Sequence, residues 1–389
     1  MGTGHVTVVG GGLGGLTAAI ATAEAGAEVT LHEAHGRLGG RGRALEGSYV
    51  AHEGAHVFYA DGEHYRWLRS RGLIGRLGWP SAAAMGRVRF RVDDELRRIP
   101  PAGMLAAQAQ AWRKAPVDET FGAWATGIWG ERTTTWMANA ISVVTYDAET
   151  TALSAAYVWD LFQRVLGPRI PAIRWVVGGW QAVIDRMAQR ARELEVRIQT
   201  GSRVDALPTG RGPVIVATDQ FAARGLLGDD SLGWPMGHAA LLDIAVRPSR
   251  GDCSLVFDLD EGGFHESYSM QDSTVAPAGE ALYQLQMPVR PDEGPSAAHE
   301  RLARLAERAL PGWRERATFT RTATARDRTG ANDLPGYTWR DRPAIDRGDG
   351  VYLVGDTVAA PGMRGEIVIN SAVEAARLAT ERIAEVAPH

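Results

Sequence analysis

The first thirty-three residues constrain the fold more than any other part of this chain. An apolar run from His5 to Val9 has the composition of a buried parallel strand, and it leads directly into glycines at positions 10, 12 and 15. A helical segment from Leu16 to Gly26 and a second strand from Glu28 to His32 follow. This order of strand, glycine-rich turn, helix and strand predicts one unit of a parallel α/β sheet.

The glycine spacing suits a turn that binds a pyrophosphate. Gly10, Gly12 and Gly15 fit the pattern G-x-G-x-x-G, which lets the backbone approach an anion at the N–H groups of a helix N-terminus. Glu33 follows the second strand, where a carboxylate accepts hydrogen bonds from ribose hydroxyls. The glycines alone are weak evidence, but their position between strand and helix, followed by an acid, predicts a dinucleotide site.

The residues after Glu33 narrow the prediction to one class of cofactor. Residues 33–41 read E-A-H-G-R-L-G-G-R, which resembles the E-x-x-x-R-x-G-G-R segment of flavoproteins in the amine oxidase and phytoene desaturase superfamily. The resemblance implies FAD as cofactor and places Arg41 against its phosphates and ribose. It also makes Gly14, Ala34 and Gly40 cofactor-binding positions.

A second signature lies at the other end of the chain. Residues 350–354 form another strand-like run, which is followed by Gly355, Asp356 and a helical pattern that continues to Ala384. This resembles the C-terminal G-D signature of the same superfamily, in which the aspartate holds the ribityl chain and the helix points its N-terminus at the flavin. A positive helix end would stabilise an anionic reduced flavin there. Met363, just before that helix, is a cofactor-binding position by the same resemblance.

Shorter segments in between resemble the superfamily too. Gly178 and Gly179 open a predicted helix that ends near Leu194, and a strand-like segment at 196–201 follows. Residues 214–218 resemble its V-x-A-T strand, although Asp219 stands where a proline is usual. The resemblance assigns contacts with the adenine side or the flavin ring to a further set of residues, namely Val204, Ala217, Gly54, Ala55 and His56.

The composition fits a two-domain enzyme with a small-molecule substrate. A chain of 389 residues is too long for one core. A net charge of −4 gives no footprint for nucleic acid, and no run predicts a transmembrane segment or signal peptide, so we expect a cytoplasmic protein. The single cysteine, Cys253, excludes an internal disulfide and gives no metal site. It lies outside the segment in which some relatives attach flavin, so we expect noncovalent FAD.

The order of the motifs predicts two domains interleaved along the chain. Segments 1–62, 172–235 and 330–389 are expected to form a Rossmann-like FAD-binding domain within an overall α/β fold. Segments 63–171 and 236–329 then form an α+β substrate-binding domain. The first is mostly helical by pattern, and the second alternates apolar and polar residues as antiparallel strands do. We expect this antiparallel sheet to carry helices on one side and to cover the flavin.

Three residues are candidates for catalysis. His56 has a side chain that exchanges a proton near neutral pH, although a hydrogen-bonded structural histidine is the more common case, and His52 is a weaker candidate of the same kind. Arg364 and Glu366 lie where the last helix begins. Glu366 would alternatively only cap that helix, with Arg364 paired to it. If Arg364 contacts the substrate, an anionic group on the substrate is expected.

Basic residues bear on the type of reaction. Lys114 is the only lysine among forty-two basic residues. In the monoamine and polyamine oxidase branch a lysine holds a water against flavin N5, and Lys114 lies in a tryptophan-rich stretch that is unsuited to this role. The phytoene desaturase-like branch is therefore favoured. The cluster of Arg321, Arg326 and Arg328 is interpreted as a solvated surface.

The resemblance implies an oxidoreductase that dehydrogenates a small organic substrate by hydride transfer to flavin N5, as a tailoring step in secondary metabolism. A flavin-dependent amine oxidase that forms an imine is the first alternative, and a redox-neutral flavin isomerase is another. GDP-dissociation inhibitors of small GTPases share the fold without using flavin, so a non-catalytic carrier is the alternative from another class. Asp356 favours the enzyme, because those carriers lack the C-terminal signature. The oligomeric state is left open.

Overall fold

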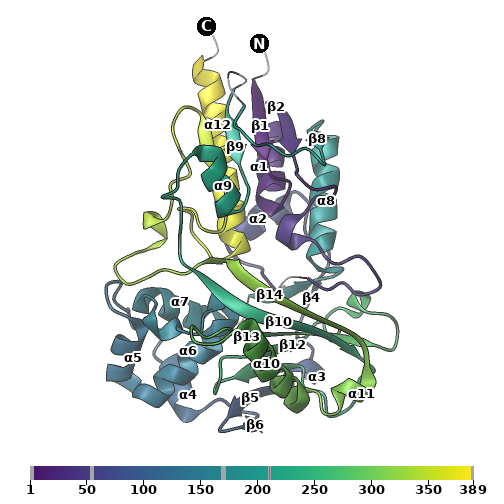
Figure 1. The fold of residues 1–389 in the computed structure, drawn as a ribbon, viewed down its shortest axis with the longest axis vertical. Coiled ribbons are helices and arrows are strands. Elements are labelled where there is room, and N and C mark those ends of the chain that lie inside the picture. The colour runs from purple at the N-terminus through teal and green to yellow at the C-terminus, as the bar shows by residue number, and fades with distance from the viewer. Residues whose placement is uncertain (1–3, 53–56, 168–171, 209, 211, 387–389) are drawn as a thin grey trace.

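The computed structural model describes residues 4–52, 57–167, 172–208, 210 and 212–386. Two layers are stacked along the long axis of the molecule (Figure 1). A parallel sheet with its helices forms one end, where the first strand and the last helix lie side by side, and a larger antiparallel sheet with its own helices forms the other. The functional question therefore concerns the region where the two layers meet.

Five strands form the parallel sheet, in the order β15-β9-β1-β2-β8. Their side chains are mostly apolar and buried, as is typical of parallel strands that are covered on both faces. The strands are β1 (His5–Val9), β2 (Glu28–His32), β8 (Arg197–Gln199), β9 (Val214–Val216) and β15 (Val351–Leu353). Both β1 and β2 begin and end at the predicted residues, so the predicted parallel unit is confirmed.

Three long helices accompany this sheet, and α1 packs against both of the others. They are α1 (Leu13–Glu24), α8 (Gly179–Glu193) and α12 (Gly365–Val386). Helix α1 begins three residues before the predicted start because Gly12 is its N-cap and Gly14 and Gly15 lie in its first turn.

Asp219 has a structural role that explains the departure from the V-x-A-T-proline pattern. It precedes α9 (Gln220–Leu227), and its carboxylate accepts hydrogen bonds from the N–H groups of Phe221 and Ala222, both at 3.0 Å. An aspartate at this N-cap position satisfies two backbone donors that have no partner within the helix. The residue therefore begins the helix in place of the proline.

A small sheet lies where the layers meet, in the order β3-β7-β4. Its strands are β3 (Val57–Tyr59), β7 (Ile173–Val176) and β4 (Leu77–Gly78), and α2 (Gly62–Ser70) follows β3. Leu68 of α2 packs into the core of the parallel sheet. The boundaries of the two domains stay predictions.

The second layer is built on a seven-stranded sheet, which we call the roof sheet, in the order β14-β10-β13-β12-β11-β5-β6. Neighbouring strands are antiparallel except β11 and β5. The strands are β5 (Val88–Val92), β6 (Glu95–Arg97), β10 (Met236–Val246), β11 (Leu255–Asp258), β12 (Phe264–Ser267), β13 (Ala281–Pro288) and β14 (Ala317–Ala331). Segment 236–329 thus forms the predicted antiparallel strands, whereas β5 and β6 come from the segment expected to be mostly helical.

Helices cover both faces of the roof sheet, so the expectation of helices on one side is wrong. Leu242 and Leu285 pack with α10 (Pro295–Ala309), while Phe257 and Phe264 on the opposite face pack with a helical core. Because buried apolar residues lie on both faces, each face needs a cover. The helical core is built from α4 (Ala102–Gln108), α5 (Phe121–Trp129), α6 (Glu131–Thr145) and α7 (Ala155–Leu166). Two further short helices are α3 (Ala82–Met85) and α11 (Trp313–Arg316).

Candidate functional site

The glycine-rich turn after β1 has no room for side chains. A Cβ atom on Gly15 would lie 1.7 Å from the carbonyl oxygen of Gly10, and one on Gly10 would lie 2.5 Å from the carbonyl oxygen of Ala217. Gly10 also has a φ of +107°, which favours glycine. On the other side of α1, a Cβ on Gly14 would lie 2.8 Å from Val354. The turn is therefore held tightly between β9, β15 and the first turn of α1.

The second glycine-rich segment packs directly on this turn. The N–H of Gly39 donates to the carbonyl of Gly11 at 2.8 Å, and Gly12 and Gly39 form a parallel bridge. A Cβ on Gly40 would lie 3.3 Å from the Cα of Gly12. Backbone therefore meets backbone here, and the positive φ angles of Gly39 and Gly40 favour glycine in the second segment.

Glu33 lies beside the turn with its carboxylate buried. One oxygen accepts the N–H of Gly11 at 2.7 Å, and the other accepts the N–H of His35 at 2.8 Å. The backbone around Ala34 pairs with the segment that leads to Val204, because Ser202 donates to the carbonyl of Glu33 at 2.8 Å. The residues predicted for the adenine side are thus neighbours. Glu33 Oε1 also lies 2.8 Å from His35 Nδ1, so Oε2 is the oxygen that keeps a lone pair for a hydroxyl donor.

The N-terminal and C-terminal signatures meet at one ion pair. Arg41 Nη1 lies 2.6 Å from Asp356 Oδ2, across 315 residues of sequence, and the same nitrogen donates to the carbonyl of Arg328. Burial acts to raise the pKa of Asp356, but the charges of Arg41 and Arg364 and the hydrogen bond from Arg41 hold it below its ordinary value. Asp356 is therefore an ionised carboxylate next to the glycine-rich turn.

The remaining predicted cofactor positions divide into two groups. Gly355 follows β15, where a Cβ would meet nothing within 4 Å, and Met363 is buried against the helical core of the roof layer. Gly54, Ala55 and His56 lie outside the described residues. Their predicted position beneath the flavin ring, and the catalytic role of His56, stay predictions.

Arg364 joins the start of α12 to the roof layer. Its φ of +51° is unusual for a residue other than glycine. Its guanidinium donates to the carbonyls of Ala331 and Val144 and, at 3.1 Å, to Asn332 Oδ1. These partners are neutral oxygen atoms, so Arg364 keeps its positive charge without a paired acid among the residues that the structure describes.

Glu366 lies in the first turn of α12 and is 7% exposed. Arg164 of α7 binds both of its carboxylate oxygens, at 2.9 and 2.7 Å, and the N–H of Met363 donates to it at 3.1 Å. Burial raises the pKa of Glu366 to about 7, although Arg164 acts against this. Glu366 does not pair with Arg364, so that alternative is wrong, and the bond from Met363 ties the carboxylate to the segment just before the helix. The carboxyl group can gain or lose a proton near neutral pH.

We call the face of the roof sheet that carries Phe264 its inner face. This face also carries a row of polar residues in register. Arg321, Asp243, Gln284 and Glu266 are direct neighbours on β14, β10, β13 and β12. Arg321 Nε lies 2.6 Å from Asp243 Oδ2, and Asp243 is buried. The interpretation of Arg321 as a solvated residue is therefore wrong, because its register places it against a buried acid. Burial raises the pKa of Asp243 to about 6, although Arg321 acts against this.

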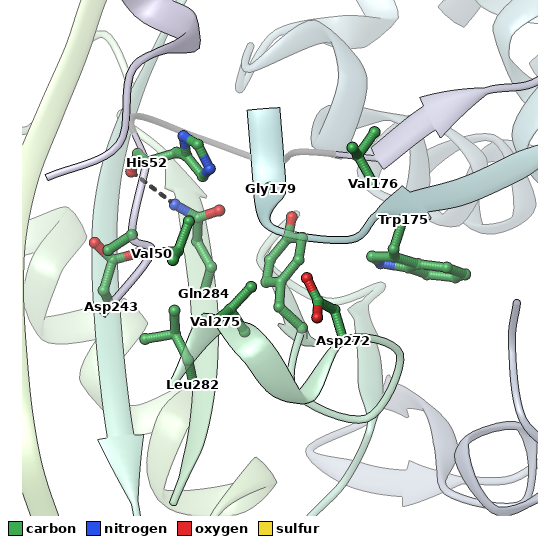
Figure 2. Close-up of a pocket in the computed structure, with 12 residues that line it drawn as sticks. Val50, His52, Trp175, Val176, Gly179, Asp243, Asp272, Val275, Leu282 and Gln284 are labelled. Carbon is green, nitrogen blue, oxygen red and sulfur yellow. Dashed lines mark hydrogen bonds between the residues drawn. The ribbon is translucent and has the colours of Figure 1, made fainter. Parts of the chain in front are cut away.

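This row holds the segment that leads into the unplaced residues 53–56. The carbonyl of His52 accepts hydrogen bonds from Gln284 Nε2, at 3.0 Å, and from Arg321 Nη2. Figure 2 shows His52, Asp243 and Gln284 on one side of a small cavity and Trp175 and Asp272 on the other. The cavity has a volume of about 20 Å³, which is enough for one water molecule.

His52 itself is unsuited to proton transfer at neutral pH. Its side chain is buried between the roof sheet and α8, where a Cβ on Gly179 would lie 2.5 Å from His52 Nε2. Burial lowers the pKa of His52 to about 4. The imidazole is therefore neutral, and its part is to pack between the two layers.

Sequence reasoning missed Arg164, Asp243 and Glu266. Arg164 is an ordinary arginine in the last turn of an amphipathic helix, so no local pattern singles it out. Asp243 gave a weak signal, because it is an acid inside a strand whose other residues are mostly buried and apolar, whereas β12 around Glu266 is short and largely polar. Buried acids in a strand require a partner, and that requirement is the signal that could have indicated a site.

The geometry fits an adenine dinucleotide that carries a flavin. Three features lie around the ends of β1, β2 and β15: the glycine-rich turn, which has space only for backbone, the buried Glu33 after β2, and the contact between Arg41 and Asp356. This is the edge of a parallel sheet at which such folds bind ligands. Fold and site thus define a nucleotide-binding protein of the Rossmann-like class.

Comparisons with known proteins agree with this class. Residues 8–70 match the family described as NAD(P)-binding Rossmann-like domain. An oxidoreductase from Methanosarcina mazei has the same fold, with a TM-score of 0.77 and 15% identity over 95% of this chain and 99% of that one. Cyclohexylamine oxidase from Brevibacterium oxydans matches with a TM-score of 0.73 and 18% identity, over 98% of this chain and 100% of that one. A UDP-galactopyranose mutase matches with a TM-score of 0.70 and 13% identity, over 100% of this chain and 97% of that one.

These solved structures confirm the predicted fold along nearly the whole chain. Comparison with curated protein sequences gives no significant match. None of the helices in the described part of the chain is both long and apolar enough to cross a membrane.

Proposed function

We propose that this chain is an FAD-dependent oxidoreductase that dehydrogenates a small organic substrate. The contact between Arg41 and Asp356, at 2.6 Å, carries the proposal. It joins two sequence signatures that each indicate FAD by resemblance, at the edge of the parallel sheet where β1, β2 and β15 end. The oxidoreductase from Methanosarcina mazei and the cyclohexylamine oxidase, which share this fold, support the same class of reaction.

Different residues of this chain are assigned to different parts of the cofactor. We assign the pyrophosphate to the glycine-rich turn and Arg41, the adenosine ribose to Glu33, and the ribityl chain to Asp356. FAD, when bound, supplies an acceptor for two electrons. The start of α12 presents backbone N–H groups that stabilise negative charge, and Met363 packs the same point against the apolar helical core. The binding is noncovalent in this proposal.

We assign the reaction to the carbon–carbon desaturating type, with hydride transfer to flavin N5, as a tailoring step of secondary metabolism in the cytoplasm. The position of Lys114 supports this type. It is exposed in the loop between α4 and α5, so the only lysine of the chain lies on the surface of the helical layer. A flavin site without lysine is what we expect of the phytoene desaturase-like branch.

One observation favours amine oxidation as the second candidate. Glu266, on the inner face of the roof sheet, is 2% exposed and accepts the indole N–H of Trp175 at 2.9 Å. A hydrogen bond with Tyr268 also acts on this carboxyl group, and burial raises the pKa of Glu266 to about 7. A buried carboxylate of this kind suits a substrate that brings its own N–H donor or positive charge.

The first experiment is the absorbance spectrum of the purified protein, with the released cofactor identified by chromatography. We expect an oxidised-flavin spectrum and FAD in the denatured supernatant. Asp356→Ala should lose most of the flavin, whereas Asp185→Ala, an exposed aspartate on α8, should retain it. A colourless protein that FAD cannot reconstitute would overturn the proposal and favour the carrier.

Anaerobic bleaching of the flavin separates the two reaction types. Each candidate substrate is added without oxygen, and loss of the oxidised-flavin band reports two-electron transfer. If primary or secondary amines bleach the wild type and fail to bleach Glu266→Gln at the same concentration, the amine oxidase replaces the desaturase as the assigned type.

A further inference from the structure

The start of α12 carries an ionic cluster that joins four elements. Arg164 Nη2 lies 2.7 Å from Glu366 Oε1 and also 2.7 Å from Asp61 Oδ1, the N-cap residue of α2. The guanidinium stacks over the ring of Tyr59 at 4.6 Å, and His64 Nε2 lies 3.7 Å from Glu366 Oε1. One guanidinium thus serves two carboxylates. With both acids ionised, the cluster has a net charge of −1.

Among the described groups that face this cluster, Glu366 is the one that can change its charge near neutral pH. His64 is bonded to the carbonyl of Tyr59 at 2.9 Å, and burial lowers the pKa of His64, so the ring is neutral. Burial raises the pKa of the Tyr59 hydroxyl, which therefore stays protonated. Arg164 stays charged. Asp61 is half exposed and is paired with Arg164. A proton on Glu366 makes the cluster neutral.

We propose that Glu366 takes up one proton when the bound flavin is reduced, and that Arg164 is the residue that positions its carboxylate. This inference rests on the proposed function. Dehydrogenation removes a hydride, which carries two electrons and one proton to the cofactor, and leaves one further proton to be bound elsewhere. In the proposal the carboxylate of Glu366 binds that proton and becomes a neutral carboxylic acid.

The location of Glu366 gives the physical reason. Its carboxylate accepts the N–H of Met363, at the helix end that the resemblance directs toward the flavin. Reduction adds negative charge near this end, and a buried carboxylate there becomes costlier because like charges repel in a medium of low dielectric constant. Protonation of Glu366 removes the repulsion. Arg164 comes from the other layer, so it also fixes the roof layer against α12 at this point.

A metal ion is the competing explanation, because Asp61, His64 and Glu366 place three ligand atoms within 4.8 Å of one another. Arg164 already supplies the positive charge between the two carboxylates. His64 Nε2 must carry a hydrogen to bond the Tyr59 carbonyl, so it has no lone pair for a metal. The cluster is therefore built for a proton.

The test is the midpoint potential of the flavin in the purified holoprotein as a function of pH. Two protons per two electrons are expected in the wild type above about pH 7, where Glu366 is ionised before reduction, and one in Glu366→Gln. The slope of the variant should be shallower by about 30 mV per pH unit, the value of a tenfold change for a two-electron couple. Glu374→Gln, a partly exposed glutamate on the same helix, should keep the wild-type slope.

Arg164 is tested by the same titration. Arg164→Gln removes the only guanidinium in the cluster, so Glu366 should hold its proton in both redox states and the extra slope should vanish. Arg164→Lys should restore part of it, which a merely structural role would not require. Chelation with EDTA should leave the wild-type slope unchanged, whereas a changed slope would favour the metal.

Three results would overturn the proposal. A wild-type slope of one proton per two electrons would do so without any variant, and so would a wild-type slope in Glu366→Gln. The third is an absorbance spectrum of the reduced flavin showing that the second proton lies on the flavin itself. Failure of the wild type to bind FAD is a different outcome, because it overturns the proposed function.

Discussion

Replacement of Gly15 by alanine tests the closed turn with a single methyl group. The new Cβ would lie 1.7 Å from the carbonyl oxygen of Gly10, 2.9 Å from its carbon and 3.5 Å from a methyl group of Val8, whereas real Cβ contacts stay above 3.0 Å. Helix α1 and the turn must therefore move apart by about 1.3 Å, the difference between 3.0 and 1.7 Å. The obstacle is backbone, so a change of side-chain rotamer cannot relieve it.

The expected cost follows from what this movement disturbs. Leu16, Ala19 and Ile20 of α1 are fully buried, so a displaced helix loses contacts along its inner face. Forcing an extra methyl group into a packed core costs about 1–3 kcal/mol, and a backbone obstacle belongs at the upper end. Alanine returns about 1 kcal/mol of helix propensity relative to glycine. We expect a net loss of about 2 kcal/mol in the free energy of unfolding, together with a large loss of FAD affinity.

The assay is urea unfolding of the flavin-free proteins, followed by titration with FAD. Gly36→Ala is the matched control, because nothing lies within 4 Å of a Cβ there and its φ is ordinary. Such a loop substitution should stabilise the protein by about 0.4–1 kcal/mol or leave it unchanged. If Gly15→Ala is as stable as Gly36→Ala and binds FAD equally well, the geometry described for the turn is wrong.

Three further predictions concern buried charge and the thiol. The pKa of Glu366 is raised to about 7, so its contribution to stability is complete below about pH 4.5 and is lost as the pH rises through 7. Urea unfolding across that window should show the wild type losing up to about 3 kcal/mol relative to Glu366→Gln. Arg321→Ala leaves Asp243 buried without its cation and should lower the free energy of unfolding by about 3 kcal/mol. The Arg326 side chain on the same strand is 74% exposed, so Arg326→Ala should change stability by less than about 0.5 kcal/mol. Thermal unfolding of both variants measures the difference. Cys253 is buried and burial raises the pKa of its thiol, so a thiol reagent should react only after unfolding, and rapid reaction with the native protein would contradict the described packing.

The parts of the fold that the sequence predicted are those with local signals. Strands β1 and β2 and the turn between β1 and α1 each occupy a short continuous stretch, and their residues match the predicted ones closely. The roof sheet was harder to predict, because β5 joins it by pairing with β11 across more than 160 residues. Neither strand alone shows that pairing. The helices on both faces of the sheet follow from the same long-range arrangement.

The candidate site divides in the same way. Glycines and acids in a fixed spacing indicated the cofactor segment, and the structure then brought Arg41 and Asp356 together. Arg321 was misread because β14 alternates polar and apolar residues like an exposed strand, and only its register with Asp243 reveals the buried side. Arg164 is positioned by the packing of α7 on the start of α12, for which a single sequence carries no signal.

Arginine contacts recur wherever the two layers touch near the candidate site. Arg164 binds Glu366, Arg321 donates to the carbonyl of His52, and Arg364 donates to the carbonyl of Val144. Each contact joins the roof layer to a segment next to the predicted cofactor site. A guanidinium has five donors in one plane, so it fixes orientation between two layers in a way that an apolar contact does not. Binding of the cofactor and the relative position of the layers should therefore be coupled, and loss of any of these arginines should weaken FAD affinity even where the side chain never touches FAD.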